Sequence, residues 1–222
     1  MAKVGSNLRV GARVTGLQIE ANRIRAIEIG AEVITIAADD IVVSAVPWFA
    51  LSKVLPEAIV GAKSFAELRS APIVCAYFSV AANGPPDEGP VVALVGGQPF
   101  HFLLRTPGDP VGQFALLSGG DRSFDGKSVA EIEAIARAQL RDYYGDLGLD
   151  QAHVRIRKEQ HATFVAAPGS DLLRPAPGRL PNGPTNLLVC GDWTATGLPA
   201  TLEGGVRSAE RLLDQVPAVN RD

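Results

Sequence analysis

Cysteine is scarce in this sequence of 222 residues: Cys75 and Cys190 are the only two, and both lie inside apolar runs. This usage argues against a disulfide framework and predicts buried free thiols in a reducing compartment. No apolar run approaches the roughly 18 residues that a membrane-spanning helix requires, and the first residues lack the apolar segment of a secretory signal. We therefore expect a cytoplasmic protein.

The sequence lacks an excess of positive charge, and it has few histidines. The net charge of −3 supplies no basic surface, so we expect no nucleic-acid partner. The three histidines, His101, His153 and His161, are too dispersed to indicate a metal site. Ser118 and the two cysteines have no G-x-S-x-G context, which disfavours a hydrolase.

The N-terminal part of the chain has the pattern of β structure. From Asn7 onward, short apolar stretches broken by polar residues predict a small antiparallel meander of half-buried strands. After Asp39 and Asp40, the run IVVSAV predicts a strand buried on both faces in an α/β sheet, ended by Pro47.

The middle of the chain predicts a second sheet. Four apolar segments separated by Gly and Pro, at 73–80, 91–95, 100–104 and 114–117, indicate antiparallel strands. Such a sheet, apolar and aromatic on one face, suits a wall for an apolar substrate and equally suits an ordinary core. Ser128 and Glu131 form a capping box for a helix that Gly145 ends, and residues 153–157 alternate as a further strand.

The stretch from Asn186 to Leu213 predicts a strand, a loop and a helix. The short apolar run 187–190 reads as a buried strand ended by Gly191, and Thr201 is an acceptable N-cap for the helix. A helix that starts with small residues can present backbone N–H groups to an anion or a polar ring edge, although the glycines equally suit ordinary packing. Apolar residues share one face of this helix: Leu202, Val206, Ala209 and Leu213.

Residues 191–212, GDWTATGLPATLEGGVRSAERL, resemble the C-terminal flavin-binding segment of the amine oxidase and phytoene desaturase superfamily. Within it they look most like the squalene-associated FAD-dependent desaturases, or hydroxysqualene dehydroxylases, except for Gly205 where alanine is usual and Ala209 where glycine is usual. The resemblance extends upstream through Ala45-Val46-Pro47 and through a series just before the last strand: Glu159, Ala162, Thr163, Phe164, Pro168-Gly169 and Arg174-Pro175.

The resemblance implies an α/β (α+β) fold, in which a partial FAD/NAD(P)-binding Rossmann-like domain carries an inserted antiparallel-sheet substrate domain. The expected segments are 1–55 (middle of the FAD-binding domain), 56–158 (substrate domain) and 159–222 (return into the FAD-binding domain). It also implies that FAD is the cofactor, with Val14 near the adenine ring, Asp192 near the ribityl or diphosphate region and the helix start at the isoalloxazine edge. The implied cofactor-binding residues are Val14, Ala45, Pro47, Gly191, Asp192, Leu198, Pro199, Ala200, Thr201 and Leu202.

Other side chains have weaker assignments. Glu203 is expected to have a structural role, and Arg105 and Arg174 either orient a polar end of the substrate or are ordinary exposed arginines. His161 is the histidine nearest the matched segment. The catalytic residues are not identified by the sequence.

One part of the superfamily pattern is missing. The dinucleotide fingerprint G-x-G-x-x-G appears nowhere in the sequence. We therefore expect the C-terminal half of a longer enzyme, as a truncated gene product or one subunit of a split protein. Its FAD site would be incomplete and its activity alone absent, and a separate N-terminal flavin-binding chain would be its partner.

The resemblance implies an FAD-dependent oxidoreductase that converts hydroxysqualene to squalene in hopanoid synthesis. Two alternatives stay open: a carotenoid or phytoene desaturase, and a non-catalytic fragment or subunit that needs a separate flavin-binding chain. A substrate this apolar also suggests peripheral contact with a membrane, although no isolated amphipathic anchor is evident.

Overall fold

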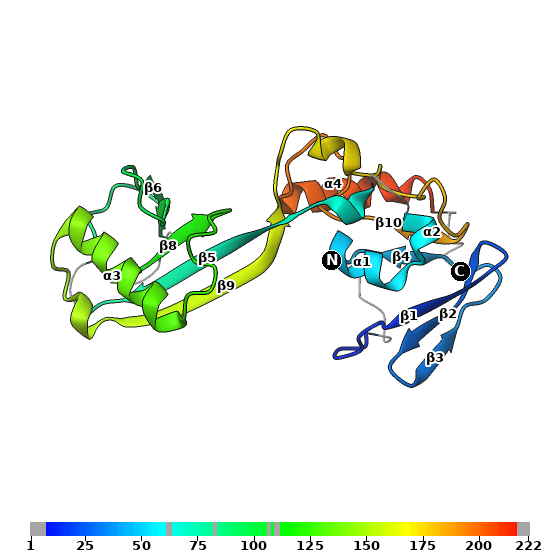
Figure 1. Ribbon diagram of the computed structural model, residues 1–222, viewed down its shortest axis with the longest axis horizontal. Helices are drawn as coiled ribbons and strands as arrows, with labels where there is room; N and C mark the ends of the chain where they lie inside the picture. Colours follow the sequence, from blue (N-terminus) through cyan, green and yellow to red (C-terminus); the bar gives the residue numbers. More distant parts are fainter. Residues whose placement is uncertain (1–7, 61–63, 82–83, 106–107, 109–111, 217–222) are drawn as a thin grey trace. The chain divides into compact units, whose positions relative to one another are not determined.

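The computed structural model describes residues 8–60, 64–81, 84–105, 108 and 112–216. The chain forms two compact units (Figure 1): unit 1 comprises Met1–Leu68 and Ala166–Asp222, and unit 2 comprises Arg69–Val165. Unit 2 is thus inserted between two chain segments of unit 1. These unit boundaries fall later in the chain than the segment boundaries expected after residues 55 and 158.

Unit 1 contains the predicted meander. Strands β1 (Gly16–Glu20), β2 (Arg23–Ile29) and β3 (Glu32–Thr35) form a three-stranded antiparallel sheet in the order β1-β2-β3. Ala21 and Asn22 connect the first two strands with φ values of 46° and 58°, the left-handed pair that a two-residue hairpin requires. The structure confirms the meander, while Asn7, where the predicted region begins, lies outside the described residues.

A parallel pair of strands lies beside the meander in unit 1. Strand β4 (Val42–Ser44) pairs with β10 (Leu187–Val189), and all three residues of β10 are buried. The expectation that residues 41–46 form a strand buried on both faces was wrong, because Val43 is 48% exposed and only three residues are extended. Within the described part of the chain β10 is the only strand that pairs with β4, so one edge of β4 lacks a neighbour.

The helices of unit 1 are short except for the last one. They are α1 (Trp48–Val54), α2 (Glu57–Val60), the 3-10 helices η1 (Phe65–Glu67) and η3 (Ser170–Leu173), and α4 (Leu202–Leu213). Helix α4 packs on β10, where Leu212 joins Leu188 and Cys190 in a buried cluster. No helix in the described ranges is long and apolar enough to cross a membrane.

Unit 2 is a five-stranded antiparallel sheet in the order β6-β7-β8-β5-β9. The strands are β5 (Ser70–Ser79), β6 (Val91–Ala93), β7 (Phe102–Leu104), β8 (Gln113–Gly119) and β9 (His153–Phe164). Strand β9 is longer than the predicted segment 153–157, because it pairs with β5 along almost the whole length of that strand, with a bulge between Ala71 and Ile73. Figure 1 shows this long pair.

Helix α3 (Val129–Tyr144) covers one face of the unit 2 sheet. The Ser128 side chain accepts from the backbone of Glu131, whose carboxylate accepts from the backbone of Ser128, so the predicted capping box is confirmed. The 3-10 helix η2 (Leu149–Gln151) follows. The buried cluster beneath α3 includes residues of β5, β7, β8 and α3: Val74, Ala76, Phe78, Leu103, Phe114, Leu116, Ile132, Ala136 and Leu140.

Candidate functional site

The two predicted segments of the site meet at the carboxyl ends of β4 and β10. These strands are parallel, so the residues that follow them, Ala45-Val46-Pro47 and Gly191-Asp192, emerge at the same edge. The backbone N–H of Cys190 donates to the Ser44 carbonyl (2.9 Å), and the Trp193 indole Nε1 donates to the Val46 carbonyl (3.0 Å). In α/β sheets, ligands bind at this edge.

The turn after β10 requires glycine. Gly191 has φ 142°, and a Cβ at this position would lie 2.7 Å from the Trp193 indole nitrogen. Its N–H donates to Ser208 Oγ on α4 (3.0 Å), and its carbonyl accepts from the Thr194 hydroxyl (2.8 Å). The hydroxyls of Thr194 and Ser208 lie 2.8 Å apart, and both residues are fully buried. This hydrogen-bond network fixes the chain between β10 and α4.

The start of α4 approaches the same turn closely. Thr201 is the N-cap, and its hydroxyl accepts from the N–H of Gly204 (3.2 Å), which confirms the predicted cap. A Cβ on Gly204 would lie 2.7 Å from the Pro199 carbonyl and 3.8 Å from the Cα of Asp192. The small residue in the first helical turn therefore serves a close backbone approach between this turn and the loop that precedes the helix.

Arg174 organises the loop between Gly191 and α4. Its side chain is only 5% exposed, and it donates from Nε to the Trp193 carbonyl (3.2 Å). Its Nη2 donates to three further carbonyls of the same loop: Asp192 (3.2 Å), Thr194 (2.5 Å) and Leu198 (2.9 Å). Neither sequence-based alternative for Arg174 described this role, because the arginine is buried and its donors are directed at backbone.

Asp192 places a carboxyl group in this turn. Burial raises the pKa of Asp192, and the backbone N–H groups of Trp193 and of Asp192 itself, followed by the charge of Arg174, partly offset that rise. The half-buried group therefore sits where protonation is easier than in water. Glu203 at the start of α4 accepts from Arg207 Nε (2.9 Å) in an exposed pair within the helix.

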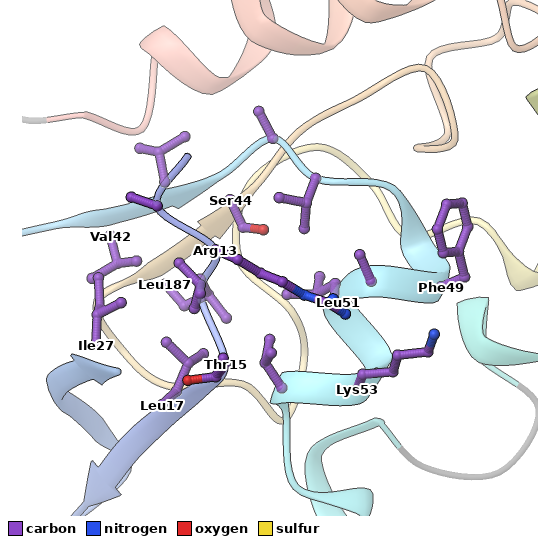
Figure 2. Close-up of a pocket in the computed structure, with 17 residues that line it drawn as sticks. Arg13, Thr15, Leu17, Ile27, Val42, Ser44, Phe49, Leu51, Lys53 and Leu187 are labelled. Atoms are coloured by element: carbon purple, nitrogen blue, oxygen red, sulfur yellow. The ribbon is translucent and has the colours of Figure 1, made fainter. Parts of the chain in front are cut away.

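A cavity of about 630 Å³ lies beside β4 and α1 (Figure 2). Val14 and Ala45 line it, whereas Pro47 N-caps α1 and the segment from Gly191 to Leu202 lies outside the lining. The structure thus brings the predicted residues together in two places. The residues that line the cavity come from the N-terminal segment, the meander, β4, α1 and β10: Ala12–Thr15, Leu17, Ile27, Val42–Val46, Phe49–Leu51, Lys53, Val54 and Leu187.

Sequence reasoning missed the polar residues of this cavity. Figure 2 shows the Arg13 side chain extending across it toward α1, with Lys53 on that helix and Ser44 on β4 also in its lining. Arg13 directly precedes Val14, so its position was a usable signal. Lys53 had no such signal, since its place depends on how α1 packs beside β4.

Thiols and imidazoles elsewhere do not form a reactive site. Burial raises the pKa of both cysteines, which keeps them as neutral thiols, and neither forms a disulfide. His161 Nδ1 lies 2.7 Å from the Ser70 hydroxyl, and His101 Nε2 lies 3.7 Å from an oxygen of Asp121. Among the described residues, no group of three or more His, Cys, Asp or Glu side chains could hold a metal ion.

Two curated proteins are similar to this chain along nearly all of it. The hydroxysqualene dehydroxylase of Sinorhizobium fredii is 34% identical over 212 residues, which cover 95% of this chain and 46% of that protein. The hydroxysqualene dehydroxylase of Rhodopseudomonas palustris is 34% identical over 222 residues, which cover 100% of this chain and 49% of that protein. The chain therefore spans about half the length of the curated relatives it matches.

Solved structures share the fold at low sequence identity. An oxidoreductase from Methanosarcina mazei superposes with a TM-score of 0.62 at 13% identity, covering 92% of this chain and 49% of that one. Cyclohexylamine oxidase from Brevibacterium oxydans superposes with a TM-score of 0.61 at 12% identity, covering 91% and 47%. The family model described as flavin containing amine oxidoreductase matches residues 1–215, and the chain therefore belongs to that family.

Proposed function

We propose that this chain forms the flavin-ring side and the substrate wall of an FAD-dependent oxidoreductase that converts hydroxysqualene to squalene in hopanoid synthesis. The observation that carries the proposal is the glycine-dependent turn after β10, which joins a Thr201-capped helix in a chain of the flavin-containing amine oxidoreductase family. The whole activity would require more polypeptide than the described units, since the relatives with this name are about twice as long.

The residues at the carboxyl end of β10 fit the ring end of FAD. The first turn of α4 directs the N–H groups of Leu202 and Glu203 out of the helix, and the helix dipole favours negative charge there. The close packing of Gly204 against the Pro199 carbonyl fixes the position of the loop that would lie beside the ring. Asp192 would accept from hydroxyl groups, and Leu198, Pro199 and Ala200 would flank the ring.

The cavity beside β4 fits the adenosine end. Val14 would offer its backbone to the adenine, with Ala45 in the same cavity lining and Pro47 setting the turn into α1. Arg13 and Lys53 would contribute positive charge near the phosphates. When bound, FAD would supply the electron transfer. The chain itself would bind and orient the flavin and the substrate, and it would exclude water from them. In this chain alone the site would be incomplete.

The open face of the unit 2 sheet supports the proposal that the substrate is apolar. Strand register places Cys75, Leu117, Phe102 and Ala93 in one row across four strands, on the face opposite the buried cluster beneath α3. The next row contains Tyr77, Ala115, Leu104 and Val91. Tyr77 is 48% exposed and Val91 is 59% exposed, although solvent-facing strands usually carry polar residues. An isoprenoid chain would bury this surface.

The test uses a completed protein, in which this chain is co-expressed with the part of the R. palustris relative outside the matched region. Purified, flavin-loaded protein with a chemical reductant is offered hydroxysqualene, and products are identified by gas chromatography with mass spectrometry. Squalene is the expected product. Desaturation of phytoene instead would favour the carotenoid alternative, and no turnover of either compound by flavin-loaded protein would contradict the proposal.

We further propose a cytoplasmic location with peripheral membrane contact.

A further inference from the structure

The open face of the unit 2 sheet changes from charged to apolar across its strands. Strand β9 forms one edge of the sheet, and its Arg155 lies beside Tyr77 of β5. In the next row Arg157 lies beside Cys75, and both arginines are exposed, as charged residues on an edge strand usually are. Beyond β5 the same two rows are apolar and contain Ala115, Leu104 and Val91 in one row and Leu117, Phe102 and Ala93 in the other. Tyr77 and Cys75 therefore lie at the boundary between a charged strip and an apolar surface.

Tyr77 brings a hydroxyl group to this boundary. It lies on β5, which has β8 on one side and β9 on the other, so the phenol is in the interior of the sheet and not at its edge. The residue is nonetheless 48% exposed. A ligand that covers the open face can therefore reach the phenol hydroxyl.

The phenol of Tyr77 is a neutral hydrogen-bonding group. The charge of a Cys75 thiolate, burial and a hydrogen bond with Cys75 raise the pKa of Tyr77, and the charge of Arg157 partly offsets this rise. Burial also raises the pKa of Cys75, so both groups keep their protons near neutral pH. A thiol is a weak hydrogen-bonding partner, whereas a protonated phenol can both donate to and accept from an alcohol. An alcohol oxygen would thus be a better partner for Tyr77 than Cys75 is.

Hydroxysqualene has the same division of polarity as this face, since it is a long hydrocarbon with one hydroxyl group. A hydroxyl that leaves water without a hydrogen-bond partner costs free energy, so a wall that was apolar throughout would favour squalene over the alcohol. A hydrogen-bonding group at the boundary reverses that preference. Because the proposed reaction removes the hydroxyl group, this preference would help new substrate to displace the product.

We infer that Tyr77 binds the hydroxyl oxygen of the substrate and so determines the preference for the alcohol over the hydrocarbon product. The hydrocarbon chain lies over Leu117, Phe102 and Val91, on the side of β5 away from the arginines. The inference rests on the proposed function, because that function supplies an alcohol as the substrate. It assigns Tyr77 a role in binding and specificity.

Cys75 provides a reporter for this face. It is half-buried beside Tyr77, whereas Cys190 is buried. Alkylation of Cys75 by a maleimide, followed by peptide mass spectrometry, therefore measures occupancy of the open face without flavin or turnover. The chain is placed in one detergent with hydroxysqualene, with squalene or with neither. We expect hydroxysqualene to protect Cys75 at a concentration about tenfold lower than squalene requires.

Tyr77→Phe removes the hydroxyl and keeps the ring. It should raise the protecting concentration of hydroxysqualene about tenfold and leave that of squalene unchanged, because only the alcohol loses a hydrogen bond. Each alkylation rate is divided by the rate of the same variant in detergent alone, which removes any direct effect of the substitution on Cys75. Tyr144→Phe is the matched control, since Tyr144 packs against the buried cluster beneath α3, and it should change neither concentration.

The completed protein gives a second measurement. Tyr77→Phe should raise the KM for hydroxysqualene about tenfold and leave the inhibition constant of squalene unchanged. A substitution that only disturbed the packing of the sheet would weaken the binding of both compounds.

The outcomes separate this inference from the proposed function. Equal protection by the two compounds, equal weakening of both by Tyr77→Phe, or the same effect from Tyr144→Phe would overturn the role of Tyr77. Absence of protection by either compound would also overturn it, whereas turnover of hydroxysqualene by the completed protein would still support the proposed function. Protection that depends on Tyr77 without any turnover would leave the binding role standing and remove the proposed reaction.

Discussion

Removal of the Arg174 side chain should destabilise unit 1 more than any surface substitution. Arg174→Met keeps the length of the stem but deletes donors to the carbonyls of Asp192, Trp193, Thr194 and Leu198. A hydrogen bond to a charged group contributes about 1.5–3 kcal/mol, and because bonds made by one side chain are not additive, we expect a total cost of about 3 kcal/mol or more.

The exposed ion pair of Arg174 adds little to the expected free-energy cost of Arg174→Met. Its ion pair with Asp171 (2.9 Å) ends on a carboxylate that is 84% exposed, and such pairs contribute about 0–1 kcal/mol. Arg174→Lys should recover only part of the loss, since an ammonium carries all its donors on one atom, whereas the guanidinium contacts the four carbonyls from two atoms, Nε and Nη2. We expect a cost of about 2 kcal/mol for the lysine variant, between the methionine variant and wild type.

Urea unfolding followed by tryptophan fluorescence is a suitable assay, because both tryptophans, Trp48 and Trp193, are buried in unit 1. Arg207→Met is the control: Arg207 pairs with Glu203 on the surface of α4, with side chains 57% and 60% exposed, and its loss should leave the stability nearly unchanged. A cost for Arg174→Met below about 1 kcal/mol, or one equal to that of the control, would refute the assigned role.

Three further predictions concern local features. Gly191→Ala places a methyl group against the Trp193 indole on a left-handed backbone and should cost about 2–4 kcal/mol in urea unfolding, whereas Gly197→Ala, with φ 80° and open space, should cost about 1–2 kcal/mol. Ser128→Ala removes the capping box and should lower thermal stability, measured by circular dichroism, by about 1 kcal/mol; no loss would contradict the cap. Because burial raises the pKa of Asp192, wild type should lose stability relative to Asp192→Asn as pH rises from about 4 through the raised pKa, and the opposite trend would exclude burial as the cause.

Local patterns in the sequence predicted most of the helices and strands. The alternation of apolar residues before Pro47 predicted the meander, and Ser128 with Glu131 predicted the start of α3, because each depends on residues close together in the chain. The spacing on α4 also predicted a helix with an apolar face. It did not predict that Val206 and Leu213 would be exposed, because burial depends on what packs against the helix.

Long-range pairing explains what the sequence could not predict. The IVVSAV run has the composition of a buried central strand, yet Val43 is half-exposed because β10 pairs with only one edge of β4. Arg174 acts on carbonyls that lie 18 to 24 positions further along the chain, a distance at which no periodicity connects residues. Strand β9 extends beyond its alternating segment because β5 supplies a partner throughout.

The candidate site was predicted in its parts and not in its arrangement. Gly191, Asp192 and Thr201 were selected by resemblance, and the structure places them at one turn. Val14 and Ala45 lie on the walls of a separate cavity within the same unit, and the cationic residue Lys53 joins them only through the packing of α1. Their roles toward a cofactor stay predictions.

The absorbance spectrum of bound flavin reports directly whether this chain supplies one side of an FAD site. The purified chain and its complex with the part of the R. palustris relative outside the matched region are each mixed with excess FAD and passed through gel filtration, and the flavin retained per protein is measured. We expect near-stoichiometric flavin in the complex and almost none in the chain alone, because this chain would supply one side of the site. Stoichiometric flavin in the chain alone, or a flavin-free complex, would contradict it.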